Sequence, residues 1–326
     1  VYINDALSQN ILFQCYEQPK TVEELAKCCG VPAFYVEERL ENLLMREALS
    51  EPAKGKFRTE FLIYSSKVGT YEQNAGEVFL PVIDGMVEAM DCLAGEAEKL
   101  GIYTAGKPKE ELVYLYGIMA LEHLSKEHNP VEWMEHPVRY DGGRWSYHAH
   151  LMNDHNYPVN GLGREQSANR GTDGTYFHTS YHFGGSTYRS MMRDTQINVC
   201  EEILNEREIS DTQAAAAAIE EGYLIRRDGK LSVEIPAFTK ERYERFCQLA
   251  EAAFAPIIHA YSRAVQRFIA GYKKLFPYHL ADDVNRACHY LFLKLYAVNV
   301  CRLAQEKGLL AIPPAGSVCD VLIQYR

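Results

Sequence analysis

Residues 5–66 carry the pattern that most restricts what this chain can fold into. Apolar residues recur there at helical spacing in three consecutive stretches. The second stretch opens with a capping box at Thr21 and Glu24, in which a hydroxyl and a carboxylate satisfy each other's backbone donors, and it ends at Gly30. The third begins at Pro32, so a short turn separates the two. We expect three packed helices, with that turn holding the second and third at a steep angle.

A basic, glycine-centred segment follows at 54–59 and is typical of a β-hairpin. Helix, helix, short turn, helix and hairpin is the order of a winged helix-turn-helix. The sequence therefore predicts that fold for residues 1–68. In it, Leu40 and Leu44 should point into the core, while Lys56 should project into solvent.

Two interpretations of this unit remain open. In the first, the third helix enters the major groove of DNA and the hairpin cations contact phosphates. The candidate DNA-binding residues are then Tyr35, Arg39, Arg46, Lys54, Lys56 and Arg58. However, residues 1–66 contain seven basic against ten acidic residues, and the third helix alone carries Glu37, Glu38, Glu41 and Glu47. Because an acidic helix repels phosphate, protein contact or dimerisation is an equally weighted second interpretation.

Residues 196–238 repeat the same order of elements in degenerate form. Asp211 or Thr212 can cap a helix that continues through an alanine run, and 228–229 is an Asp-Gly hairpin signal. An alanine surface offers no groups with which to read bases. We therefore expect a winged-helix-like unit whose helix packs against something, in preference to a second DNA reader.

The remaining sequence predicts a helical region, which makes the fold class α+β and mostly helical. Long apolar stripes predict helices from Ile83 and from Pro108, and Pro256 should break the helix that Thr239 caps. A strongly apolar helix is expected over 282–307, and the tail at 318–325 predicts a final strand. We expect residues 69–326 to form a helical regulatory region that contains the winged-helix-like unit and a small antiparallel sheet.

Residues 127–190 differ from the rest in composition and hold seven of the eleven histidines and both tryptophans. The stretches 144–151 and 175–183 are typical of strands, while 153–174 between them predicts an irregular loop. We expect this polar β insert to form a recognition face for a small ligand or a protein. The candidate ligand-binding residues are Trp145, Tyr147, His148, His150, Tyr176, His178, Tyr181 and His182.

Motif searches predict no metal site, no cofactor and no catalytic residues. Histidines of the insert, together with Asp154, could bind a transition metal. However, the ligand patterns typical of zinc sites, which are cysteine thiolates or H-E-x-x-H, do not occur there. G-x-S-x-G, G-x-x-x-x-G-K-[ST] and a G-x-G-x-x-G after a strand are all missing. The nine cysteines form no C-x-x-C. We expect buried, unactivated thiols in a reducing cytoplasm.

Composition sets broad limits. The chain has 326 residues, of which 47% are hydrophobic and 24% charged, as in folded proteins, and its length predicts two or three domains. It shows neither a run of about 18 apolar residues that would span a membrane nor a secretory leader. The net charge of −10 argues against bulk DNA affinity. Because the chain opens with Val1 inside a helical pattern, we expect a fragment of a longer protein.

Short motifs spread over most of the chain carry a family resemblance. They are residues 4–12 (NDALSQNIL), 15–19 (CYEQP), 21–26 (TVEELA), 32–38 (PAFYVEE), 58–61 (RTEF), 236–240 (PAFTK) and 308–313 (GLLAIP). With them the chain resembles the carboxy-terminal extensions of sigma-70-like, extracytoplasmic-function-type RNA polymerase sigma factors of Firmicutes.

That resemblance implies transcription regulation in the cytoplasm, with DNA, RNA polymerase or another protein as partner. The family's parts that melt the −10 element and read the −35 element are not visible, and we expect them upstream of Val1. This chain alone should therefore not support promoter-specific initiation. The alternative function is a protein-interaction or small-ligand-sensing module whose winged helices are scaffolds. The charge around the third helix discriminates between the two.

Overall fold

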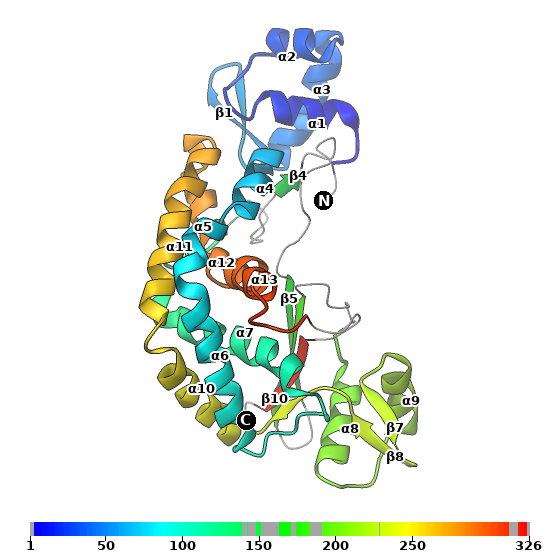
Figure 1. Ribbon diagram of the computed structural model, residues 1–326. Coiled ribbons are helices and arrows are strands. Elements are labelled where there is room, and N and C mark those ends of the chain that lie inside the picture. Colours follow the sequence, from blue (N-terminus) through cyan, green and yellow to red (C-terminus); the bar gives the residue numbers. More distant parts are fainter. Residues whose placement is uncertain are drawn as a thin grey trace. The chain divides into compact units, whose positions relative to one another are not determined.

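The computed structural model describes residues 3–138, 142, 148–150, 163–170, 174–182, 191–227, 229–312 and 319–324. Its fold is α+β and mostly helical, as the sequence predicts. By contacts the chain forms two compact units, each built from three stretches (Figure 1). Unit 1 comprises Val1–Asn74, Val131–Pro158 and Gln266–Tyr290, and unit 2 comprises Ala75–Pro130, Val159–Val265 and Leu291–Arg326. The polar insert therefore contributes to both units, while the domain boundary expected at residue 68 stays a prediction.

Unit 1 is built from short helices and two pairs of strands. Its elements are α1 (Ala6–Gln14), α2 (Val22–Cys29), α3 (Ala33–Met45), β1 (Leu49–Ala53), β2 (Lys56–Thr59), β3 (Leu62–Tyr64), α4 (Ser66–Gln73) and β4 (His148–His150). Strands β1 and β2 form an antiparallel hairpin, and β3 pairs with β4 in parallel. Helices α11 (Ile258–Tyr272) and α12 (Ala281–Leu295) cross the division between the units.

The helical spacing of apolar residues in α1, α2 and α3 produces one core, around which the three helices gather in Figure 1. Ile11, Leu25 and Val36, one from each helix, are fully buried. Leu40 is buried as predicted and Lys56 is exposed, whereas Leu44 is only half-buried.

The capping box predicted at Thr21 is present. The Thr21 hydroxyl accepts from the Glu24 N–H at 3.3 Å, and Glu24 Oε2 accepts from the Thr21 N–H at 2.8 Å. We expect Thr21→Ala to lower the free energy of unfolding by about 1 kcal/mol, because the start of α2 loses a backbone partner. Thr70→Ala, an exposed change within α4 of the same unit, is the control and should change stability by less than about 0.5 kcal/mol. Equal midpoints for the two variants in urea denaturation would contradict the prediction.

Unit 2 combines long helices with a sheet. Its helices are α5 (Gly76–Phe79), α6 (Ile83–Glu98), α7 (Lys109–His128), α8 (Asp194–Leu204), α9 (Thr212–Glu220), α10 (Lys240–Phe254) and α13 (Cys301–Glu306). Its strands are β5 (Gly163–Arg170), β6 (Thr175–His182), β7 (Leu224–Arg227), β8 (Lys230–Val233), β9 (Ala237–Phe238) and β10 (Cys319–Gln324). The break predicted at Pro256 is confirmed, since α10 ends at Phe254 and α11 begins at Ile258.

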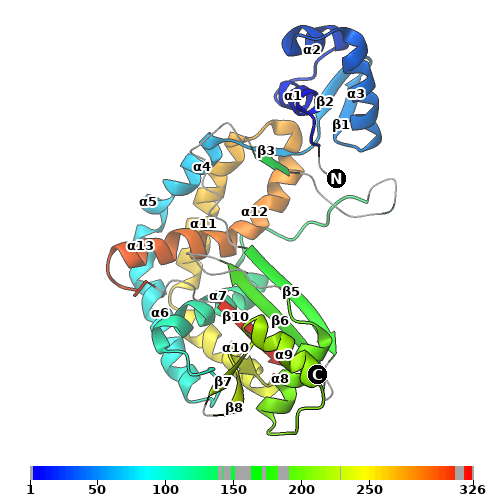
Figure 2. The same ribbon diagram turned by 90° about the vertical axis from the view of Figure 1, so that its right-hand side faces the viewer.

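A four-stranded sheet in the order β5-β6-β10-β9 lies within unit 2 (Figure 2). Strands β5, β6 and β10 are antiparallel, but β9 joins β10 in parallel, so the sheet is mixed where a purely antiparallel one was expected. The final strand predicted at the end of the chain is confirmed as β10.

Two local predictions in unit 2 need correction. Strand β5 lies inside 153–174, which was expected to be an irregular loop. Its residues are polar on both faces, so they lack the alternation of apolar and polar residues that would predict a strand. The strand forms at the edge of the sheet through its pairing with β6. The long apolar helix expected up to Lys307 is interrupted by one π-helical turn, Tyr296–Val300. None of the helices in the described ranges combines the length and the apolar character that a membrane span requires.

Candidate nucleic-acid interface

The β1–β2 hairpin is held against the first helices by backbone contacts. Lys20 and Phe57 exchange two backbone hydrogen bonds of 3.0 and 2.8 Å, which tie β2 to the segment before α2. The Thr59 hydroxyl donates to the Leu12 carbonyl at 2.6 Å, and the Thr59 carbonyl accepts from His279 Nε2 at 2.9 Å. These contacts fix the hairpin relative to the first helices of unit 1, while the residues of its turn are exposed.

The tip of the hairpin carries the cations that the sequence singles out. Gly55 has a φ of 71°, a left-handed conformation that glycine adopts without strain, and its N–H donates to a Glu51 carboxylate oxygen. Lys54 and Lys56 flank it and are both exposed. Within the described part of the chain neither lysine makes an ion pair, so both ammonium groups are available to an anion.

Arg58, on the same hairpin, is engaged differently. Its Nε lies 2.9 Å from Glu60 Oε1, and both side chains are 27% exposed. The same Glu60 oxygen accepts a hydrogen bond from Ser50. Because its charge is already paired, Arg58 adds little to the positive potential of the tip.

Arg39 and Arg46 lie on the side of α3 that faces the start of α1. Together with Asp5 they line a hollow of about 200 Å³. Arg39 Nε is 3.5 Å from Asp5 Oδ1. Burial raises the pKa of Asp5, but the Ser8 hydrogen bond and the Arg39 charge outweigh it and leave the pKa below its usual value. The charge of Arg39 is therefore partly neutralised by Asp5 within unit 1.

The part of α3 that faces solvent is acidic and apolar. We call it the outward stripe: Phe34, Glu37, Glu38, Glu41 and Met45, all exposed at helical spacing. Phe34 is 69% and Met45 60% exposed, which is unusual for large apolar side chains. The glutamates were expected from the sequence, whereas Phe34 and Met45 were not, although all five residues follow helical spacing.

The six candidate DNA-binding residues are divided between the β1–β2 hairpin and α3 with its C-terminal cap, and their role in DNA binding stays a prediction. The two lysines share the hairpin tip, whereas Arg39 and Arg58 pair with carboxylates of unit 1. Tyr35 is 53% exposed at the start of α3, where its ring meets the Phe34 ring edge-on at 5.7 Å. By the criterion stated above, an acidic third helix favours protein contact over base reading.

The candidate ligand-binding residues fall into different units. His148 and His150 belong to β4 of unit 1, and the His150 ring stacks on Tyr64 at 5.2 Å. His182 ends β6 of unit 2. Trp145, Tyr147 and Asp154 lie outside the described residues.

Tyr176, His178 and Tyr181 of β6 are buried, with exposed fractions of 6, 0 and 2%. The Tyr176 hydroxyl donates to Glu201 Oε1 at 3.0 Å, and the Tyr181 hydroxyl donates to a Glu122 carboxylate oxygen. The two tyrosines therefore join the sheet to α8 and α7. The expected recognition face is wrong for these three residues, because their side chains contact α7, α8 and the segment before α8 inside unit 2.

His178 occupies a closed polar site. Its Nδ1 accepts the Met192 N–H at 3.1 Å, so its other nitrogen, Nε2, carries the proton. That Nε2 lies 3.7 Å from Asp320 Oδ2, and both side chains are fully buried. The Tyr223 ring meets the imidazole edge-on at 5.4 Å. This site supports the fold and is not open to a ligand.

Thiols and metal-ligating groups give no further site in the described ranges. Burial raises the pKa of Cys200 and Cys301 to about 12, which keeps these thiols protonated and unreactive as expected. Cys28 and Cys92 are exposed, which corrects the expectation that all the thiols are buried. No group of three His, Cys, Asp or Glu side chains among the described residues is arranged to hold a metal ion.

Compared with models of known protein families, with curated proteins and with solved structures, the chain matches none of them. Its function must therefore be argued from its own residues.

Proposed function

We propose that this chain is a regulatory region of a sigma-70-like transcription factor, whose amino-terminal winged helix-turn-helix binds a protein partner. The order of α1, α2, α3 and the β1–β2 hairpin supports that fold, with Gly30 at a φ of 68° in the turn between α2 and α3. The sequence motifs that resemble sigma-factor extensions support the role in transcription.

The outward stripe of α3 is the observation that carries the protein contact. Its apolar ends supply area whose burial stabilises a complex, and its three glutamates select a partner with cations beside an apolar surface. Phosphate would be repelled by the same glutamates. RNA polymerase is the partner that the resemblance implies.

Binding of the full chain to immobilised core RNA polymerase from a Firmicutes bacterium tests this proposal. Phe34→Ser combined with Met45→Ser should weaken binding at least about tenfold, because exposed apolar anchors dominate such interfaces. Phe13→Ser, at an exposed phenylalanine of α1 that is outside the stripe, is the matched control and should bind like the wild type. The proposal fails if the wild type does not bind, or if the stripe variant binds equally well.

A second candidate function, DNA contact through the hairpin, is favoured by the two lysines at its tip. Two neutralised phosphates predict that the logarithm of the binding constant falls with the logarithm of salt concentration at a slope of about −2. Lys54→Ala with Lys56→Ala should abolish that binding to a fluorescent duplex. Lys27→Ala with Lys67→Ala removes the same charge from exposed sites elsewhere in unit 1 and should leave it intact. Anisotropy that stays flat at about 25 mM salt would reject this candidate.

A further inference from the structure

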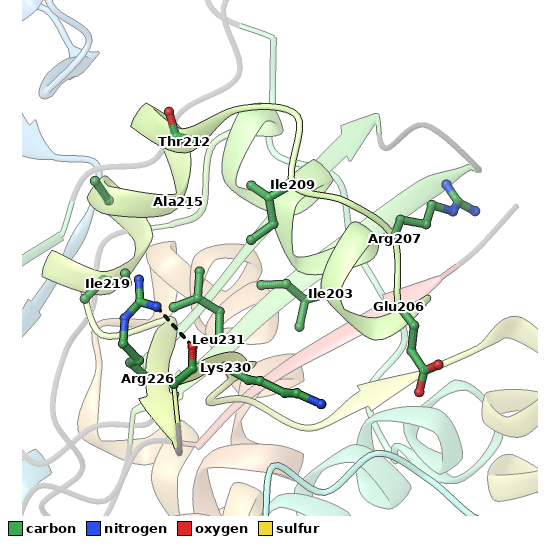
Figure 3. A pocket seen from close by; sticks show the side chains of 12 residues that line it. Ile203, Glu206, Arg207, Ile209, Thr212, Ala215, Ile219, Arg226, Lys230 and Leu231 are labelled. Carbon is green, nitrogen blue, oxygen red and sulfur yellow. Dashed lines mark hydrogen bonds between the residues drawn. The ribbon is translucent and has the colours of Figure 1, made fainter.

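Unit 2 contains a surface groove between the end of α8, helix α9 and the β7–β8 hairpin (Figure 3). Its volume is about 730 Å³, within the range of sites that take ligands. We call it the α9 groove. Four aliphatic side chains form its floor: Ile203, Ile209, Ile219 and Leu231. In Figure 3, Ile203 of α8, Ile209 of the segment after it and Leu231 of β8 point toward the same hollow.

The sequence of α9 explains why the groove stays open. Ala214 and Ala218 pack into the core of this part of unit 2, where Cys200 and Val233 are fully buried. Ala215 is also buried in that core, and its side chain lines the groove together with the exposed Ala216. Because an alanine side chain ends at Cβ, these two positions place no longer side chain in the groove. The alanine run, expected to pack against something, thus has one packed side, while Ala216 and Ile219 on the groove side are exposed.

The rim of the groove is basic. Arg207, Arg226 and Lys230 lie on it, against a single carboxylate within the described lining, Glu206. Arg226 pairs with Leu231 across the hairpin, and its Nη1–H donates to the Gly229 carbonyl at 3.2 Å, which holds the guanidinium beside the apolar floor. The neighbouring Arg227 is directed elsewhere, with its Nη2 2.8 Å from Glu234 Oε1.

We propose that the α9 groove binds an acidic, amphipathic helical segment of a partner protein. The aliphatic floor accepts the apolar face of such a segment, and Arg226 and Lys230 bind carboxylates at its edge. The nine residues of α9 make a wall about 13 Å long, which matches two to three turns of a partner helix. This proposal does not depend on the function proposed for unit 1.

Charge and chemistry favour this occupant over nucleic acid. The exposed surface of α9 in the groove consists of alanine, isoleucine and the Thr212 hydroxyl, so it offers almost no hydrogen bonds to base edges. Ile219 is 39% exposed, and contact with a phosphate backbone would leave it and the floor unburied. A carboxylate-bearing apolar helix satisfies both the floor and the rim.

The test uses the full chain and a fluorescent, end-capped peptide of about 14 residues, with leucine at helical positions i, i+3, i+4 and i+7 and glutamate elsewhere. The comparison peptide keeps the leucines and replaces each glutamate with glutamine. At about 50 mM salt the acidic peptide should bind at least about tenfold more tightly, and the difference should shrink as salt rises.

Variants locate the binding. Arg226→Glu with Lys230→Glu should weaken the acidic peptide about tenfold or more. Ala216→Trp fills the groove from an exposed position without removing a core side chain and should block both peptides. Lys99→Glu with Arg302→Glu reverses two cations of unit 2 outside the groove and should have no effect. The proposal is overturned if the two peptides bind equally, if neither groove variant weakens binding, or if duplex DNA displaces the acidic peptide at lower concentration than unlabelled peptide does.

Discussion

Replacing His178 with alanine is expected to lower the free energy of unfolding of unit 2 by about 3–5 kcal/mol. The change deletes the acceptor of the Met192 N–H and the N–H nearest to the Asp320 carboxylate, and it leaves a cavity against the Tyr223 ring. The Met192 N–H would then be buried without an acceptor, and the Asp320 carboxylate, which accepts no hydrogen bond within the described residues, would lose its nearest N–H. Hydrogen exchange of the β6 and β10 amides, together with the urea midpoint, measures the loss.

His259→Ala provides the matched control, because the same side chain is removed from an exposed position in unit 2. It should change stability by less than about 0.5 kcal/mol. Similar midpoints for the two variants would show that the closed site around His178 contributes nothing to the fold. They would also reopen the interpretation of His178 as a ligand-binding residue.

The sequence predicts the first helices and the hairpin of unit 1 well, because their signals are local. The capping box at Thr21, the left-handed Gly30 and the glycine-centred hairpin each act over a few residues, and each is found where expected. The apolar stripe of α6 behaves in the same way, with Ile83, Met90 and the residues between them at helical spacing buried. Periodicity and caps determine such elements without help from distant parts of the chain.

The β insert was harder because its structure depends on partners that are far away in sequence. β6 becomes interior only when β10, more than a hundred residues later, pairs with it. His178 and Tyr181 look like surface residues in sequence, and their partners Asp320 and Glu122 come from other elements. When only its own residues are considered, a polar strand that other elements of the fold cover looks like an exposed strand.

The charges available at the candidate nucleic-acid interface were also hard to predict from the sequence, because they depend on distant partners. Arg39 and Arg58 count as cations in the sequence, but the carboxylates that pair with them, Asp5 and Glu60, are placed by the packing of α1 and by the hairpin. The α9 groove was only half foreseen. The alanine run predicted that α9 packs against another element. The groove beside α9 also depends on Leu231 of β8 and Ile203 of α8, which the fold brings next to it.

Replacing Gly117 with alanine is expected to destabilise unit 2 by about 2 kcal/mol, although alanine is the better helix former. Gly117 lies within α7, where a Cβ would come 2.0 Å from Tyr296 Oη and 3.0 Å from Tyr296 Cζ. Tyr296 cannot easily retreat, because its side chain is fully buried in the π-helical turn and its hydroxyl donates to Met90 Sδ at 3.3 Å. Thermal unfolding of the full chain measures the loss.

A double-mutant cycle isolates the cause. Tyr296→Phe deletes the atom that lies nearest to the new Cβ, so Gly117→Ala should cost about 1 kcal/mol less in the phenylalanine background than in the wild type. Gly95→Ala is the matched control: Gly95 is within α6 and has open space around its Cβ position, so alanine there should stabilise by about 0.5–1 kcal/mol. If both glycine variants are stabilised alike, α7 does not make this close approach to Tyr296. If Gly117→Ala lowers stability by the same amount in both backgrounds, the strain lies in the helix backbone instead.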